Sequence, residues 1–182
     1  NKNLQRLGFQ NLTTILRDIR INNNPALASI IGLAVTGNVT SFSLIGSNVV
    51  HLNTLSGMTS IGFGDTGDLL IKDNPLLNDI SGLSAITSIN RNLEISNNDS
   101  LLNLNGLNNL STINYGYLSI MDNALLTQVD ALQNLTSVGI LGNVEGVLIV
   151  NNTALTSLNG LGAMATLKGS LTIRNNPALV DL

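Results

Sequence analysis

The sequence contains no cysteine and no tryptophan, and aromatic residues make up only 3% of it. Without cysteine there is no disulfide framework and no thiolate metal site. With so few aromatic residues the core has to be built from Leu, Ile and Val, which suits thin, regular layers. Charged residues are also scarce, at 10% against roughly 25% in typical soluble domains. The surface must therefore consist of Asn, Ser, Thr and Gly.

The same scarcity argues against several classes of function. Eight Lys and Arg and a net charge of −3 do not provide the basic cluster that nucleic acid requires. No apolar run approaches the 18 or more residues of a membrane span. His51 is the only histidine, and no P-loop or dinucleotide fingerprint occurs. We therefore predict no enzyme activity, no cofactor, no nucleic-acid partner and no membrane insertion. The acidic residues are scattered among different parts of the chain: Asp18, Asp79, Glu94, Asp130 and Glu145.

What the sequence does contain is a repeat of 24 or 25 residues. Its pattern is L-x-I-x-x-N-x-x-L-x-x-[LIV]-x-G-L-x-x-[LI]-x-x-[IV], as in the segment Leu93–Ile113. Successive spacings of the leucine that follows the Asn are 25, 25, 24, 25, 29 and 24 residues. This leucine recurs at Leu27, Leu52, Leu77, Leu101, Leu126, Leu155 and Leu179. Such regularity indicates a solenoid.

The repeat predicts an all-β solenoid of about seven coils. The L-x-I alternation is typical of a strand with one buried face, and the later spacings of two and three favour short strands joined by corners. Each coil buries its leucines only against neighbouring coils. We expect residues 1–182 to form a single solenoid domain, as a segment of a longer protein, with Leu4, Leu7, Leu12 and Ile15 as the second half of an earlier coil.

Two kinds of residue mark the predicted corners. Asn tolerates left-handed backbone, and its amide bonds to neighbouring main chain, so the recurring Asn predicts a structural ladder. Its members are Asn24, Asn48, Asn74, Asn98, Asn123, Asn152 and Asn176. A second corner carries Gly, where positive φ or close backbone approach is expected. Its members are Gly32, Gly57, Gly82, Gly106 and Gly160, with Ala131 in one coil.

These residues resemble the receptor L-domain family, a leucine-rich right-handed β-helix. The resemblance covers essentially the whole chain and is carried by NNPALASIIGL, DNPLLNDISGL, NNDSLLNLNGL and NNTALTSLNGL. It implies an extracellular or cell-surface module whose L-x-I sheet faces a ligand. Animal members carry cysteine-rich modules and disulfides that are missing here, so a bacterial, exported version is expected.

The outward residues of the L-x-I strands form the predicted partner-binding face. They are Arg20 and Asn22, Ser43 and Ile45, Leu70 and Lys72, Glu94 and Ser96, Ser119 and Met121, Leu148 and Val150, and Thr172 and Arg174. Contiguous exposed apolar side chains tend to mark an interaction site. Here they are Ile45, Leu70, Met121, Leu148 and Val150. Packing beneath another part of the same parent protein and binding of a separate ligand are both open interpretations.

Two insertions lengthen the same corner, three coils apart. They span residues 61–69 and 138–147, and we predict that they emerge on one edge of the stack. Their candidate contact residues are Asp65, Asp68, Asn143 and Glu145. The two aspartates are too few oxygen ligands for a good Ca²⁺ site, so no metal is predicted.

The sequence thus favours a non-catalytic recognition or adhesion module that binds a protein or glycan through its sheet face and corner loops. One alternative is a structural spacer or filament subunit, whose partners are neighbouring domains or subunits. A minor alternative, ice binding, is suggested by recurring Ser/Thr pairs such as Thr59/Ser60, Thr87/Ser88, Ser111/Thr112 and Thr136/Ser137.

Overall fold

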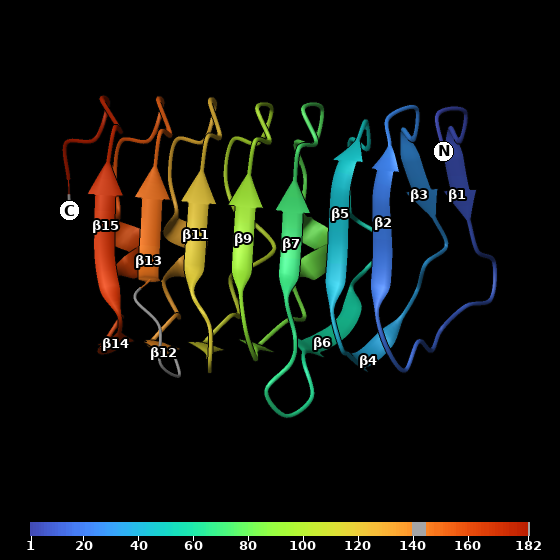
Figure 1. The fold of residues 1–182 in the computed structure, drawn as a ribbon, viewed down its shortest axis with the longest axis horizontal. Helices are drawn as coiled ribbons and strands as arrows, with labels where there is room; N and C mark the ends of the chain where they lie inside the picture. The colour runs from blue at the N-terminus through green and yellow to red at the C-terminus, as the bar shows by residue number, and fades with distance from the viewer. Residues whose placement is uncertain (140–144, 182) are drawn as a thin grey trace.

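The computed structural model describes residues 1–139 and 145–181, which form one stack of parallel coils (Figure 1). Within these residues a front sheet takes one strand from each of seven coils. The strands are β2 (Ile19–Asn24), β5 (Phe42–Ser47), β7 (Leu69–Lys72), β9 (Leu93–Ser96), β11 (Leu118–Met121), β13 (Glu145–Val150) and β15 (Ser170–Arg174). They lie side by side in chain order, so the predicted all-β solenoid of about seven turns is confirmed.

A second sheet forms the next side of the stack. It contains β4 (Thr36–Val39), β6 (Gly57–Ile61), β8 (Ser88–Ile89), β10 (Thr112–Ile113), β12 (Ser137–Gly139) and β14 (Thr166–Lys168). The [LI]-x-x-[IV] end of each repeat supplies these short strands. Ile61, Ile89, Ile113 and Val138 point from them into the core and are at most 1% exposed.

The third side differs from the prediction of strands and corners alone. In the described part of the chain, β1 (Arg6–Gly8) and β3 (Ser29–Ile31) pair there as strands, with Leu7 opposite Ile30, and isolated bridges join His51 to Asp79 and Gln128 to Ser157. Later coils instead contain short 3₁₀ helices: η1 (Ser81–Leu83), η2 (Asp130–Leu132) and η3 (Asn159–Leu161). A 3₁₀ turn advances the chain by about 2 Å per residue. A 3₁₀ turn can therefore place core residues such as Ile80 and Leu83 along a side of the coil that is too short for an extended strand.

The front strands alternate as the L-x-I pattern predicts. Leu93, Ile95, Leu118 and Ile120 are fully buried, while the residues between them point away from the core. The register is the predicted one at the outward positions of every front-strand pair, and Ser43 lies opposite both Arg20 and Leu70. A register shift occurs between Glu145 and Val147, before the outward positions of β13. Because side-chain direction alternates with period two, this register decides which residues form the outer face.

The corner after the front strands requires left-handed backbone at the residue before the ladder position. This residue has a φ of 53–58° at Asn23, Asp73, Asn97, Asp122, Asn151 and Asn175, and Gly46 takes the same place with a φ of 66°. The prediction that the ladder asparagines themselves use this conformation is therefore wrong by one residue. Asn, Asp and Gly tolerate left-handed backbone best, which explains the residue types found there.

The ladder position itself is occupied by Asn74, Asn98, Asn123 and Asn152, which are fully buried, and by the partly buried Asn24 and Asn176. Each buried amide bonds to a strand carbonyl of the preceding coil, as Asn123 does to Ile95 at 2.9 Å. Asn48 is not a member. Ser47 lies three residues after the core residue Leu44, and its Oγ donates to Asn74 Oδ1 at 2.7 Å.

The glycine corner depends mainly on close backbone approach. A Cβ added to Gly82 would lie 1.7 Å from the carbonyl oxygen of Leu52, and one added to Gly160 would lie 2.0 Å from that of Val129. Gly32 and Gly106 have positive φ as well, at 71° and 121°. Neighbouring coils are therefore in backbone contact at this corner. The prediction that Gly57 belongs to it is wrong, because Gly57 lies in β6 opposite Thr36.

Candidate functional site

The outward face of the front sheet, here called the L-x-I face, consists of two rows of side chains. Strand pairing aligns Arg20, Ser43, Leu70, Glu94, Ser119, Leu148 and Thr172 in one row. It aligns Asn22, Ile45, Lys72, Ser96, Met121, Val150 and Arg174 in the other. No described segment crosses in front of these strands in Figure 1. The sequence-predicted residues of these strands are thus aligned on one face of the sheet.

An ion pair occupies the middle of this face. Lys72 Nζ lies 2.6 Å from Glu94 Oε1, and the side chains are only 30% and 12% exposed. Ser96 Oγ also donates to Glu94 Oε1, at 3.4 Å. The pair lies between the coils of Ile45 and Met121, so the prediction of one contiguous apolar stripe is wrong. Polar groups separate two smaller apolar areas.

The first apolar area contains Ile45 and Leu70 on adjacent strands, both half-buried. The second contains Met121, which lies opposite Val150, and Leu148 on the same strand as Val150. Val150 is only 3% exposed, although the sequence placed it among the exposed apolar residues. In its row Val150 lies between Met121 and Arg174, whose side chains are longer, on strands about 4.8 Å apart.

Three serines of the face are buried as well: Ser43, Ser96 and Ser119. Ser43 Oγ donates to Asn22 Oδ1 at 3.0 Å, so both residues already have a partner. Ser119 is 1% exposed and lies between Glu94 and Leu148. Among the described residues its hydroxyl has no hydrogen-bond partner. These serines are therefore not contact residues in this conformation, because longer side chains beside them define the surface.

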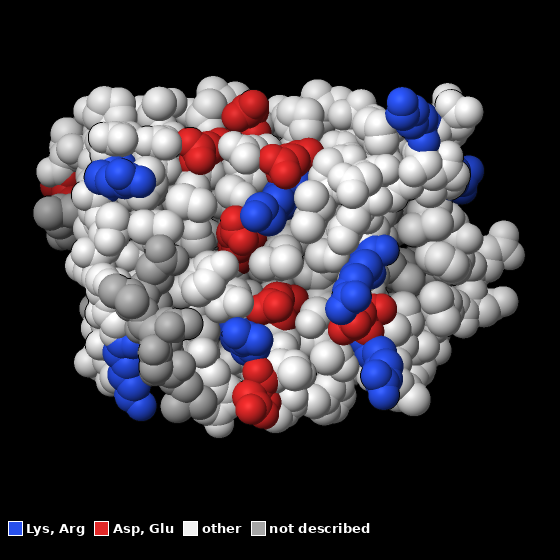
Figure 2. Space-filling model, viewed as in Figure 1, with Lys and Arg blue, Asp and Glu red and all other residues white. Residues whose placement is uncertain are grey.

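Exposed cations lie at both ends of the face. Arg20 on β2 is exposed and pairs with Asp18, with 2.7 Å between Nη2 and Oδ2. Arg174 on β15 is exposed, and Thr172 on the same strand is half-buried. Figure 2 shows both signs of charge scattered over this view, without a broad area of one sign. The face offers a mixture of small apolar areas and separate charges.

The loop between β6 and β7 projects beyond the lower corner of the stack in Figure 1. Asp65 is exposed on it, as is Phe63, a residue that is 50% exposed. Asp68 is instead engaged within the fold, because its Oδ1 accepts from the backbone N–H of Asn92 at 3.2 Å and from Asn92 Nδ2 at 2.8 Å. Asp65 and Phe63 therefore remain available for contact, whereas Asp68 fixes the corner.

The second predicted insertion is described only in part. Asn143 lies outside the described residues, and Glu145 begins the backbone of β13. β13 belongs to the same sheet as β7, three strands further along. The chain therefore enters both strands at the same corner of the stack.

The described part of the chain contains no cluster of His, Asp and Glu side chains. His51 and Asp79 are both partly exposed, and 4.0 Å separates Nδ1 from Oδ2. No three His, Asp or Glu residues among those described lie close enough to hold a metal ion. One hydroxyl in each of three Ser/Thr pairs is engaged within the stack, because those of Thr87, Ser111 and Thr136 each donate to a carbonyl of the preceding coil. Their neighbours Ser88, Thr112 and Ser137 are half-exposed on the second sheet.

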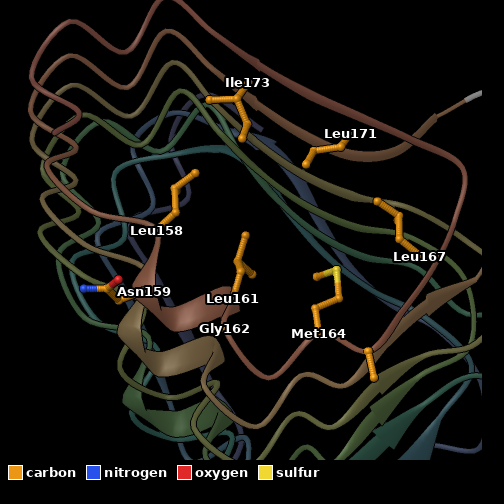
Figure 3. A pocket seen from close by; sticks show the side chains of 9 residues that line it. Leu158, Asn159, Leu161, Gly162, Met164, Leu167, Leu171 and Ile173 are labelled. Carbon is orange, nitrogen blue, oxygen red and sulfur yellow. The ribbon is translucent and has the colours of Figure 1, made fainter. Parts of the chain in front are cut away.

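An apolar hollow of about 490 Å³ opens in the coil of η3, β14 and β15. Figure 3 shows Leu158, Leu161, Met164, Leu171 and Ile173 pointing into it. The other residues that line it are Asn159, Gly162, Ala165 and Leu167. None of these side chains ionises. The equivalent positions of inner coils, such as Leu132 and Leu135, are fully covered by the following coil. The hollow is thus the uncovered interior of one coil.

Comparison with protein families gives one match: the Receptor L domain model matches residues 87–182, just over half of the chain. The matched segment includes β9, β11, β13 and β15 of the L-x-I face. No curated protein and no solved structure matches the chain. Within the described residues, no helix has the length and apolar character needed to cross a membrane.

Proposed function

The chain belongs to the receptor L-domain family, and we propose that it is a non-catalytic recognition module that binds an extracellular protein or glycan through its L-x-I face. Receptor L domains are ligand-binding modules of extracellular receptor regions. Localisation at the cell surface, in an adhesive role, follows as part of this proposal.

The observation that carries the proposal is the open arrangement of the L-x-I face. Ile45, Leu70, Met121 and Leu148 are apolar but only half-buried, and they lie on paired strands. Exposed apolar areas surrounded by polar groups are typical of interaction sites. The Lys72–Glu94 pair adds charges of fixed geometry, which favour specificity over affinity. Phe63 and Asp65 extend the available surface at the lower corner.

The test replaces the apolar residues of the face by charged ones. A panel of cell-surface proteins and arrayed glycans is first screened with the wild-type protein to identify its partner. We expect the variant Leu70→Glu/Met121→Glu/Leu148→Glu to lose binding to that partner, because three carboxylates would have to be desolvated. The matched control places three glutamates on the second sheet, as Ser88→Glu/Thr112→Glu/Ser137→Glu, at half-exposed outward positions. Circular dichroism checks that both fold. Retention of binding by the first variant, or equal loss in both, contradicts the proposal.

A second candidate function is that of a structural unit that stacks end to end. The repeated coil favours it, because core leucines such as Leu132 and Leu135 are fully buried against a following coil of the same kind. On this hypothesis the protein associates in a concentration-dependent manner. The variant Leu171→Asp/Ile173→Asp should then remain monomeric in sedimentation. A wild-type protein that is monomeric at every concentration rules this candidate out.

A further inference from the structure

Three leucines outside the L-x-I face are exposed on consecutive coils. Leu76 is 48%, Leu102 is 50% and Leu125 is 51% exposed. In each coil a neighbouring leucine fills the core position, namely Leu77, Leu101 and Leu126, and is fully buried. The exposed leucines therefore contribute nothing that the core requires. They lie on the corner that follows β7, β9 and β11, and we call them the leucine corner.

Hydrogen bonds fix the leucines relative to one another. Leu76 and Leu125 each follow a ladder asparagine by two residues, and Ser100 occupies the equivalent position in the coil between them. The Oγ of Ser100 donates to the carbonyl of Pro75 at 2.6 Å. Leu102 lies two residues further along the middle coil, and its carbonyl accepts from the Thr127 backbone N–H at 3.0 Å. With about 4.8 Å between coils, Leu76 and Leu125 are about 10 Å apart, with Leu102 to one side.

Acidic residues flank the leucine corner. Asp73 and Asp122 directly precede ladder asparagines, and Asp99 directly follows one. The Oδ1 atoms of Asp73 and Asp122 accept from Nδ2 of Asn97 and Asn151 at 2.8 Å, so neutral amides hold these two carboxylates in place without cancelling their charge. Figure 2 shows acidic side chains at the upper edge of the view, over the ends of β7, β9 and β11. No Lys or Arg occurs in segments 73–90, 97–114 and 122–139. These segments contain two further acidic residues, Asp79 and Asp130. Lys72, which precedes Asp73, is paired with Glu94 on the L-x-I face.

We propose that the leucine corner is a second interaction surface, which docks a cationic amphipathic helix of a partner protein. Apolar side chains of the helix cover Leu76, Leu102 and Leu125, and its Lys or Arg side chains face the carboxylates of Asp73, Asp99 and Asp122. Two helical turns advance by about 11 Å, which matches the separation of Leu76 and Leu125. Exposed apolar residues beside charge of one sign favour a partner of opposite sign. The surface is separate from the L-x-I face and does not depend on the function proposed for it.

The test uses a fluorescein-labelled amphipathic helical peptide made of Leu and Lys, with a Leu and Glu peptide of the same pattern as the charge control. Fluorescence anisotropy measures binding at low and high salt. We expect the Lys peptide to bind at least about tenfold more tightly than the Glu peptide. We expect the variant Leu76→Ser/Leu102→Ser/Leu125→Ser to bind it at least about tenfold more weakly, a loss of about 1.4 kcal/mol.

Charge is tested with Asp73→Asn/Asp122→Asn. Asn occupies the same left-handed position at Asn97 and Asn151, so these changes preserve the backbone. The control Asp65→Asn/Asp181→Asn removes the same charge from exposed positions elsewhere. We expect the first pair to weaken binding several-fold at low salt and less at high salt, because exposed charges are screened. The control should bind like the wild type.

Several outcomes would overturn the proposal. They are equal binding of the two peptides, full binding by the leucine variant, and equal weakening by both pairs of Asp substitutions. A fourth is loss of binding in Leu70→Ser/Met121→Ser/Leu148→Ser with retention in the leucine-corner variant, which would assign the peptide to the L-x-I face.

Discussion

Asn98 is hydrogen-bonded to Ile71 of the preceding coil: its side-chain amide Nδ2 donates to the carbonyl oxygen of Ile71 at 2.9 Å. The same amide donates to the carbonyl of Ser96 at 3.0 Å, and the backbone N–H of Asn98 donates to Asn123 Oδ1 at 3.1 Å. One fully buried side chain thus holds its own corner and connects it to both neighbouring coils.

The first prediction follows from this arrangement. Asn98→Ala removes the partner of the buried carbonyl of Ile71, and each buried polar group left unsatisfied costs about 1–3 kcal/mol. We expect the free energy of unfolding to fall by about 2–4 kcal/mol, measured by urea denaturation. Asn105→Ala, at an exposed position of the same coil, is the control and should change it by less than about 0.5 kcal/mol. Equal effects would show that the ladder does not stabilise the stack.

A second prediction concerns two buried serines with opposite hydrogen-bond status. Ser119→Ala removes a hydroxyl that lacks a partner among the described residues, so stability should stay constant or rise by about 1 kcal/mol. Ser47→Ala removes the donor to Asn74 Oδ1 and should lower stability by about 1–2 kcal/mol. Thermal unfolding of both variants distinguishes the two cases. A destabilised Ser119→Ala would show that its hydroxyl has a bound partner.

The third prediction concerns backbone contact between coils. Gly82→Ala places a Cβ 1.7 Å from the carbonyl oxygen of Leu52, so the coils must separate locally. We expect a loss of about 2–3 kcal/mol, which is typical of overpacking. Gly8→Ala is the control, since nothing lies within 4 Å of a Cβ added there. Denaturation midpoints measure both, and an unchanged midpoint for Gly82→Ala would contradict the close approach.

The fourth prediction concerns the ion pair on the L-x-I face. Lys72→Met leaves the carboxylate of Glu94, which is 12% exposed, without its cation, and we expect stability to fall by about 1–2 kcal/mol. The double variant Lys72→Met/Glu94→Leu removes both charges and should recover most of that loss. A double-mutant cycle in urea measures the coupling. Additive effects would mean that the pair contributes nothing to stability.

The sequence predicted the fold because its main determinant, apolar periodicity, is present in every coil. Leu69 and Ile71 or Leu118 and Ile120 alternate with polar or half-buried residues, and this alternation alone fixes the strand faces and their register. The 3₁₀ helices were missed because spacings such as Ile80 to Leu83 fit several kinds of turn. Their geometry depends on contact with the next coil.

The details of the corner and of the surface were harder to predict from the sequence. Asn48 was assigned to the ladder by residue type, whereas counting three residues from Leu44 identifies Ser47, whose hydroxyl replaces the amide. The burial of Ser119 and Val150 could not be read from alternation, because it depends on the length of side chains on adjacent strands. Leu76, Leu102 and Leu125 were hidden by the fully buried leucine next to each of them.

The repeated inter-coil bonding has a consequence for variation in chain length. Residues 93–117 span one complete turn, from the first core leucine of β9 to the residue before that of β11. Excision of all of them would bring Leu118 beside Leu69 and Asn123 beside Asn74, so that equivalent residues fill the core and ladder positions. Excision of a single residue from β9 would instead turn its core side chains toward solvent. Length changes inside a front strand are therefore restricted to whole turns, whereas the corners accept extra residues, as the loop between β6 and β7 does.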